Sequence, residues 1–353
     1  NFADAKASGG LVHNKVGKIG RYPDVKNTSF ASFLQANYQV TPKLSVNGGV
    51  RYQYTNTDVS DFVAVNQQYM ILIGQYNSAN AVKGGEKDYS NVLFNSGIVY
   101  KISKDQQVWA NFSQGFEIAD PAKYYGHGNY DAHLGRLPGY GPNLPSGGGV
   151  SVANSALDGV KTNALELGWR LNNQDVSAQL VAYASRSDKE IKYDKKTFSV
   201  KELDNDERVY GLEGQLDYYV TNSFSLGTNF NYIITEVKAD GDWDDTDIDA
   251  ASPSKASAYI AWKSDSMTAR LQTMQMLSYE DDNNAKLHSY NTVDLLTGFR
   301  LPVGALQFGV TNLLNTDYET LWSQRAQEIY GVASLTKFNG QGRTYSVNYS
   351  FEF

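Results

Sequence analysis

The stretch Gly342–Phe353, which reads GRTYSVNYSFEF, decides the fold class. Its apolar side chains recur at every second position and share one face of an extended chain: Tyr345, Val347, Tyr349, Phe351 and Phe353. The positions between them carry Thr, Ser, Asn and Glu. Because successive side chains of a strand point to opposite faces, this alternation predicts a β-strand with one aromatic and one polar face. Such a strand suits a sheet that faces lipid on one side and water on the other.

The composition of the 353 residues narrows the class of protein. The mean hydropathy is −0.46, and no segment approaches the roughly 18–20 continuous apolar residues of a membrane helix. Aromatic residues are plentiful, with 25 Tyr, 15 Phe and 5 Trp, as the interfacial belts of a membrane barrel require. The absence of Cys excludes disulfides and zinc–thiolate sites. The net charge of −7 argues against a nucleic-acid partner, which requires a basic surface.

Alternating segments recur along the chain in pairs, and a short turn joins the two members of each pair. The pairs are 28–39 with 43–57, 91–103 with 107–114, 162–171 with 176–189, 209–220 with 224–237, 254–263 with 267–279, and 289–300 with 305–313. With the terminal stretch they predict about thirteen strands, each near the 9–11 residues that a tilted membrane strand needs. The connections between pairs are long, so short and long connections alternate.

This alternation of connection lengths indicates an up-and-down barrel, in which all short turns collect at one rim and all long loops at the other. The polar face of the strands carries charges, such as Glu166, Arg170 and Glu213, that a dry core does not accept without partners. The sequence therefore predicts an all-β protein, a transmembrane antiparallel β-barrel with a watery or plugged lumen, and no helix of any length. A soluble β-protein is the alternative.

An odd number of strands bears on domain organisation, because bacterial single-chain barrels have an even number. Counting back from Phe353 on the periplasmic side places residues 1–27 in an extracellular loop. We therefore expect residues 1–27 to be a loop remnant and residues 28–353 to be the C-terminal part of a barrel whose first strands lie outside this chain. A miscounted strand is the alternative.

Five segments resemble those of TonB-dependent receptors of the Gram-negative outer membrane. They are 108–116 (VWANFSQGF), 160–168 (VKTNALELG), 209–214 (VYGLEG), 312–318 (NLLNTDY) and the terminal Phe353, and they occur in the family's order. Two positions depart from the family's pattern. Thr162 and Asn163 stand where Pro-Glu is usual, and Leu314 stands where Phe is usual.

The resemblance implies a plugged barrel of about 22 strands that imports a scarce solute across the outer membrane. Energy would come from the TonB–ExbB–ExbD complex through an N-terminal plug domain, which would lie outside this chain. Residues 321–326 and 330–343 resemble the corresponding segments of ferric-aerobactin receptors, so a ferric siderophore of hydroxamate or citrate type is the expected substrate. Iron enters only as part of that substrate, and no other cofactor is expected. Outer-membrane lipid and lipopolysaccharide would surround the barrel.

Three other functions remain open from the sequence. One is passive diffusion through a porin, and another is TonB-dependent uptake of cobalamin or haem. The third is a surface hydrolase or adhesin on a smaller barrel, which would need a catalytic constellation. No catalytic motif stands in the required strand–turn–helix context, so an enzyme is not expected.

Two loops combine aromatic rings with cationic side chains, a mixture that suits ferric siderophores. The candidate contacts in the first loop are Tyr124, Tyr125, His127, Arg136 and Tyr140. Those in the second are Trp322, Gln324, Arg325 and Lys337. Arg325 is the expected partner of a citrate-type carboxylate, with Trp322 or Tyr125 lining the pocket. The alternative is that these loop aromatics pack against one another or form the outer girdle.

Other polar features have simpler interpretations. The acidic run 240–249 lacks the Glu at loop position 12 that an EF-hand requires, so a solvated loop is expected. His127 and His133 have no third ligand at metal-site spacing, and no metal site is predicted. Glu213 and Asp217 are expected to face the lumen rather than to form a catalytic pair.

Overall fold

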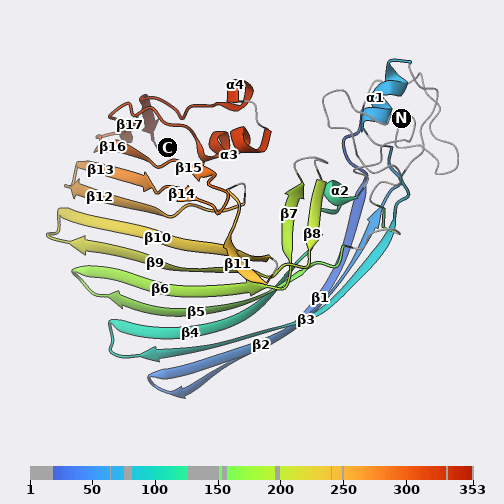
Figure 1. The fold of residues 1–353 in the computed structure, drawn as a ribbon. Coiled ribbons are helices and arrows are strands. Elements are labelled where there is room, and N and C mark those ends of the chain that lie inside the picture. The colour runs from blue at the N-terminus through green and yellow to red at the C-terminus, as the bar shows by residue number, and fades with distance from the viewer. Residues whose placement is uncertain are drawn as a thin grey trace.

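The computed structural model describes residues 19–63, 65–74, 82–125, 151–152, 157–194, 199–239, 241–248, 250–330 and 333–351. Within these ranges, one antiparallel sheet of 14 strands curves into an open trough (Figure 1). Thirteen of them form one path: β1 (Val25–Thr41), β2 (Leu44–Val59), β3 (Gly85–Lys101), β4 (Gln106–Glu117), β5 (Val160–Asn172), β6 (Val176–Ser187), β9 (Glu207–Tyr219), β10 (Phe224–Ala239), β12 (Lys255–Lys263), β13 (Met267–Met276), β16 (Tyr290–Arg300), β17 (Ala305–Thr311) and β18 (Thr344–Ser350).

The thirteen strands of this path correspond one to one with the predicted strands, so the all-β prediction is confirmed. The short turns lie together at one end of the strands and the long connections at the other (Figure 1). We call these ends the short-turn rim and the long-loop rim. The long connections carry smaller elements: β7 (Glu190–Asp194), β8 (Ser199–Leu203), β11 (Asp242–Asp245), β14 (Tyr279–Glu280) and β15 (Lys286–Leu287).

The strand register sorts the side chains into two faces. Leu226, Ile260, Leu271 and Leu295 are consecutive cross-strand partners from β10 to β16, and we call their side of the sheet the apolar face. The opposite side, the polar face, carries a parallel row: Asp217, Gly227, Tyr259, Gln272 and Asp294. This separation is what strict period-two alternation imposes on a sheet with two different surroundings.

The prediction that the chain contains no helix is wrong. Among the described residues, four helices lie in the long connections: α1 (Val65–Leu72), α2 (Pro121–Tyr124), α3 (Leu321–Tyr330) and α4 (Ala333–Thr336). None of the helices in the described ranges is long and apolar enough to cross a membrane. α3 begins after Thr320, whose hydroxyl accepts a hydrogen bond from the backbone N–H of Ser323 at 3.2 Å and so caps the first turn.

Several strands extend further toward the long-loop rim than the sequence predicts. β3 begins at Gly85 rather than at residue 91, and β1 begins at Val25 rather than at residue 28. The added residues are mostly polar, which hid the alternation, but their backbones pair fully with β2. Residues 1–18, which make up most of the predicted loop remnant, lie outside the described residues.

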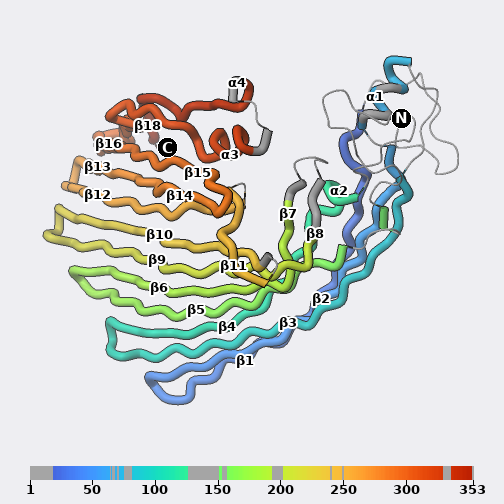
Figure 2. The backbone as a smooth tube through the Cα atoms, in the orientation of Figure 1, coloured from blue at the N-terminus to red at the C-terminus, as the bar shows by residue number. Residues whose placement is uncertain are grey.

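The buried residues concentrate near the long-loop rim rather than within the sheet. One cluster there contains Val59, Ala119, Tyr124, Tyr125 and Leu157. Most strand residues are exposed or half-buried, and Figure 2 shows the trough open between the N-terminal and C-terminal strands. β1 and β18 each have one strand partner among the described residues.

Candidate ligand-binding site

Helix α3 is tied into the long-loop rim by its first buried turn. The side-chain oxygen of Gln324 accepts a hydrogen bond from the backbone N–H of His288 at 2.6 Å, and its amide donates to the carbonyl oxygens of His288 and Glu319. The buried hydroxyl of Ser323 donates to the carbonyl oxygen of Thr336 and accepts from the backbone N–H of Phe338. These contacts fix α3 against the connection before β16 and against the segment before β18.

Arg325 joins α3 to a second loop. Its guanidinium donates to the backbone carbonyl oxygens of Ile248 and Ala251, in the connection between β11 and β12. An arginine that donates to two carbonyls holds two loops in one geometry. Arg325 therefore holds α3 against the connection between β11 and β12. The ligand contact expected of Arg325 stays a prediction.

A cavity of about 360 Å³ lies at the long-loop rim between β16 and the segment around α3. On one side the rings of Tyr290 and Tyr318 stack with centroids 4.5 Å apart. The Tyr318 ring lies across Gly340, where an added Cβ would come within 2.1 Å of a ring carbon. Lys337 and Gln324, two of the residues predicted for the site, also line this cavity.

The lysine and the two carboxylates of this cavity each have a hydrogen-bonding partner. The Lys337 ammonium lies 3.0 Å from a carboxylate oxygen of Glu319, and the amide of Asn339 donates to Asp317 at 3.0 Å. The hydrogen bond from Lys337, with a second from Gln327, holds the pKa of the Glu319 carboxyl below its usual value. Stacked rings beside balanced donors and acceptors suit a ligand that carries both amide-like and acidic groups.

Trp322 projects from α3 without lining this cavity. Its ring is 60% exposed and packs against Phe338, with centroids 5.3 Å apart. Leu335 on α4 is also exposed. This apolar surface at the long-loop rim is available to a ligand or to a neighbouring loop, and the contact predicted for Trp322 stays a prediction.

The first predicted loop has a different character. Tyr124 and Tyr125 are buried, Tyr125 to 1% exposure, and their rings meet edge to face at 4.9 Å. The Tyr125 hydroxyl accepts a hydrogen bond from the backbone N–H of Leu157 at 3.1 Å. Both rings thus pack inside the loop. This agrees with the alternative interpretation of the sequence, in which the loop aromatics pack against one another. The remaining candidates of this loop lie outside the described residues: His127, Arg136 and Tyr140.

Sequence reasoning missed Tyr290, Tyr318 and His288 as members of the cavity. The signal for Tyr318 was present, because it closes the NLLNTDY segment. That segment is built around Asn312, a buried residue with a positive φ of 50°. Its amide donates to the carbonyl oxygens of Thr316 and Gln341, which joins the two ends of the last long connection and positions Tyr318.

The described part of the acidic run, residues 241–248, is mostly exposed or half-buried and contains one short strand. Asp242–Asp245 form β11, and the backbone N–H of Asp245 donates to the carboxylate of Asp282 at 2.7 Å. Burial, followed by the nearby Asp282, raises the pKa of Asp245. Across the described ranges, no group of three or more His, Asp or Glu side chains is arranged to hold a metal ion.

This chain is similar in sequence to a known family of β-barrels and to individual receptors. The family described as "TonB dependent receptor-like, beta-barrel" matches residues 2–313. The chain is 43% identical over its whole length to a ferric aerobactin receptor of Klebsiella pneumoniae and covers 48% of that protein. It is 38% identical to a rhizobactin receptor of Rhizobium meliloti (strain 1021), with 98% of the chain and 46% of the receptor aligned.

A solved structure supports the same fold. The copper transporter OprC matches with a TM-score of 0.71 at 16% identity, covering 94% of this chain and 48% of that one. The present chain spans about half the length of the curated relatives it matches. The segments 108–116, 160–168 and 209–214, which resemble those of TonB-dependent receptors, lie within the matched residues. The chain belongs to the family of TonB-dependent receptor-like β-barrels.

Proposed function

We propose that this chain is the C-terminal barrel portion of an outer-membrane receptor that imports a ferric siderophore of the hydroxamate or citrate type. The observation that carries the proposal is the 43% identity to a ferric aerobactin receptor along the entire chain. The identity to a rhizobactin receptor extends over nearly the same residues. In both cases the long connections, where a ligand would bind, are aligned together with the strands.

The proposal includes a location and an energy source. The apolar face, with its row from Leu226 to Leu295, would contact outer-membrane lipid, and lipopolysaccharide would surround the outer rim. The long-loop rim would face outward and the short-turn rim the periplasm. Uptake would be driven by TonB–ExbB–ExbD through a plug domain supplied outside this chain, together with the remaining barrel strands.

At the long-loop rim, we assign the ligand to the cavity beside α3. The stacked pair Tyr290 and Tyr318 covers an apolar part of the siderophore, and Lys337 exchanges its ion pair with Glu319 for a ligand carboxylate. Gln324 and Arg325 act as positioning residues, because both hold α3 against its neighbouring loops. Trp322 extends the apolar surface next to them.

Growth under iron limitation tests the proposed function. A strain that lacks the intact receptor is compared with one that carries it, with ferric aerobactin, a ferric catecholate, haem or cobalamin as the supplied nutrient. The proposal requires receptor-dependent growth on ferric aerobactin that stops when TonB is deleted. Growth that persists without TonB would instead identify a passive porin, and dependence on haem or cobalamin would reassign the substrate.

A further inference from the structure

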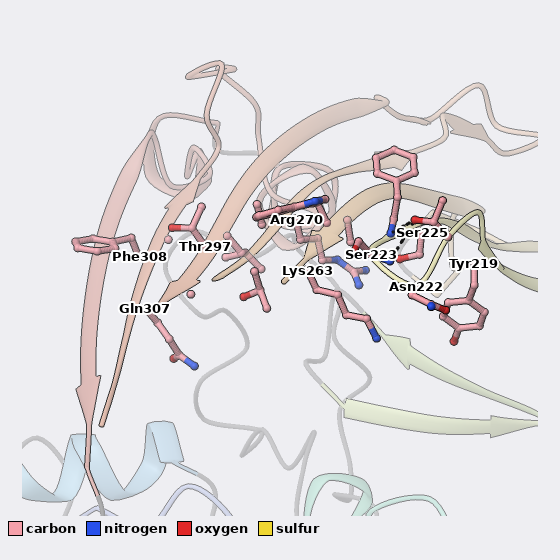
Figure 3. A pocket seen from close by; sticks show the side chains of 18 of the residues that line it. Tyr219, Asn222, Ser223, Ser225, Lys263, Arg270, Thr297, Gln307 and Phe308 are labelled. Carbon is pink, nitrogen blue, oxygen red and sulfur yellow. Dashed lines mark hydrogen bonds between the residues drawn. The ribbon is translucent and has the colours of Figure 1, made fainter. Parts of the chain in front are cut away.

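A second cavity lies far from α3, on the polar face next to the short-turn rim. It has a volume of about 550 Å³, within the range of small-molecule sites, and is formed by strands from β9 to β18 (Figure 3). Its lining combines apolar residues, such as Trp262 and Leu296, with hydroxyl and amide side chains, among them Ser223, Ser225, Thr268, Gln307 and Asn348. These groups donate hydrogen bonds without carrying a charge.

Two cations also line this cavity, and they are neighbours on one face. Arg270 lies directly opposite Ala261 across β12 and β13, and Lys263 is two residues from Ala261 on the same side (Figure 3). Such diagonal neighbours lie about 7–8 Å apart at their backbones, within reach of one shared ligand. No Asp or Glu contributes to the described lining, and neither cation forms an ion pair with a described residue.

Neighbouring side chains hold the guanidinium of Arg270 in one orientation before any ligand binds. Its guanidinium carbon lies 3.7 Å from the centroid of the Tyr259 ring, and its Nε donates to the side-chain oxygen of Gln272 at 3.0 Å. Tyr259 is itself held, since its hydroxyl donates to Asp217 at 2.5 Å. Its ring also lies across Gly227, where an added Cβ would come within 2.1 Å of the ring.

The terminal amino groups of Arg270 can therefore bind a ligand. Its stacking on the Tyr259 ring restricts the rotation of its side chain. An arginine whose orientation is set before binding loses less entropy for each hydrogen bond formed. Its planar donor pair matches a carboxylate in a bidentate arrangement. Asp217 lies on the neighbouring row with Tyr259, from whose hydroxyl it accepts a hydrogen bond, and it is not part of the cavity lining.

We propose that this cavity is a second binding site, distinct from the one beside α3, and that it takes a small polycarboxylate through Arg270 and Lys263. The surrounding hydroxyl and amide groups donate to the remaining carboxylate oxygens. The link to transport rests on the proposed function: a citrate-type ferric siderophore entering at the long-loop rim would meet this second site near the short-turn rim before it leaves the barrel.

The test uses citrate as the probe, with the intact receptor folded in detergent and titration calorimetry as the readout. We expect R270Q and K263Q each to weaken citrate binding about tenfold or more, the loss typical of removing a charged hydrogen-bond donor. R270K, which keeps the charge without the planar fork, should recover part of the affinity. The matched control is R170Q, since Arg170 is an exposed arginine on the polar face of β5 at the same rim.

The outcomes separate the site from the proposed function. Citrate affinity that is the same in R270Q, K263Q and the unaltered chain, with all three equally resistant to heat, would overturn the second site. Binding of an acidic peptide but not of citrate would overturn it as well, since the cavity would then serve a polypeptide. If citrate binds as expected while iron-limited growth shows no siderophore uptake, the site stands and the proposed function fails.

Discussion

The indole ring of Trp109 lies across Gly168, its direct partner on the neighbouring strand, so closely that a Cβ on Gly168 would be 2.0 Å from a ring carbon. The indole N–H donates to Glu166 at 2.5 Å, which keeps the ring flat on the polar face. Tyr259 and Gly227 repeat this arrangement between β12 and β10. Aromatic rings laid over cross-strand glycines thus line the polar face without projecting from it.

Gly168→Ala should therefore destabilise the barrel, because the new methyl group displaces the Trp109 ring from the sheet and breaks its bond to Glu166. We expect a loss of about 1–3 kcal/mol, the usual cost of overpacking. Denaturant unfolding in detergent, followed by Trp fluorescence, measures it. Gly115→Ala is the control, since nothing lies within 4 Å of a Cβ added there. Equal stability of the two variants would contradict the close approach.

Arg325→Ala should loosen α3 rather than unfold the barrel. The substitution leaves the carbonyl oxygens of Ile248 and Ala251 without their charged donor, a loss of roughly 2 kcal/mol for the local structure. Hydrogen exchange should accelerate in α3 and in the connection between β11 and β12, and remain unchanged in β9 and β10. Glu328→Ala, at an exposed position of the same helix, should exchange as the unaltered chain does.

Acid should open the ion pair between Glu319 and Lys337. The pKa of Glu319 is lower in the folded chain than in the unfolded chain, so its contribution to stability is complete above the ordinary glutamate value of about 4.3. That contribution is lost as the pH falls through the lower, folded value. Hydrogen exchange of α3 measured from pH 6 to pH 3 should show this loss. In Glu319→Gln the pH dependence should be flatter, and an unchanged profile would assign it to other groups.

Charges placed on the two faces of β3 should destabilise the barrel to different extents in a bilayer. Val92 lies on the apolar face beside Tyr52, and its neighbour Asn91 lies on the polar face. Val92→Lys should cost about 2–4 kcal/mol if it lies near the middle of the membrane, whereas Asn91→Lys should cost far less. Urea unfolding in lipid vesicles gives both values. Similar costs for the two variants would argue that the apolar face does not contact lipid.

The strand order was predictable because period-two alternation and short turns are local properties of the sequence. The ends of the strands were less so. From Gly85 to Ser90 only Tyr89 is aromatic or aliphatic, yet the segment continues β3, since the backbone of β2 offers it a partner regardless of side-chain character. The signal for α3 was present at Thr320, an N-cap residue followed by Gln, Arg, Ala and Glu, but the all-β pattern obscured it.

The candidate site was predictable only in part. Lys337 and Gln324 do line one cavity, as their shared loop suggested. Tyr125 and Arg325 carry the chemistry of ligand contacts, but their burial and backbone bonds depend on which loops meet at the rim. Those loop–loop contacts join residues far apart in the chain, such as Arg325 and Ile248. No local sequence pattern predicts them. Likewise, Arg270 and Lys263 become neighbours only once the register of β12 and β13 is known.

The segregation of short turns from long connections also has a kinetic consequence. Bringing together two strands that are joined by a short turn costs little conformational entropy, so each such hairpin can form early and independently. β18 reaches β17 only through the long connection that contains α3, and it therefore docks after the hairpin of β16 and β17. Pulsed hydrogen exchange during refolding should show amides of β17 facing β16 protected before those facing β18. The lengths of the connections thus determine the order in which the strands pair during folding.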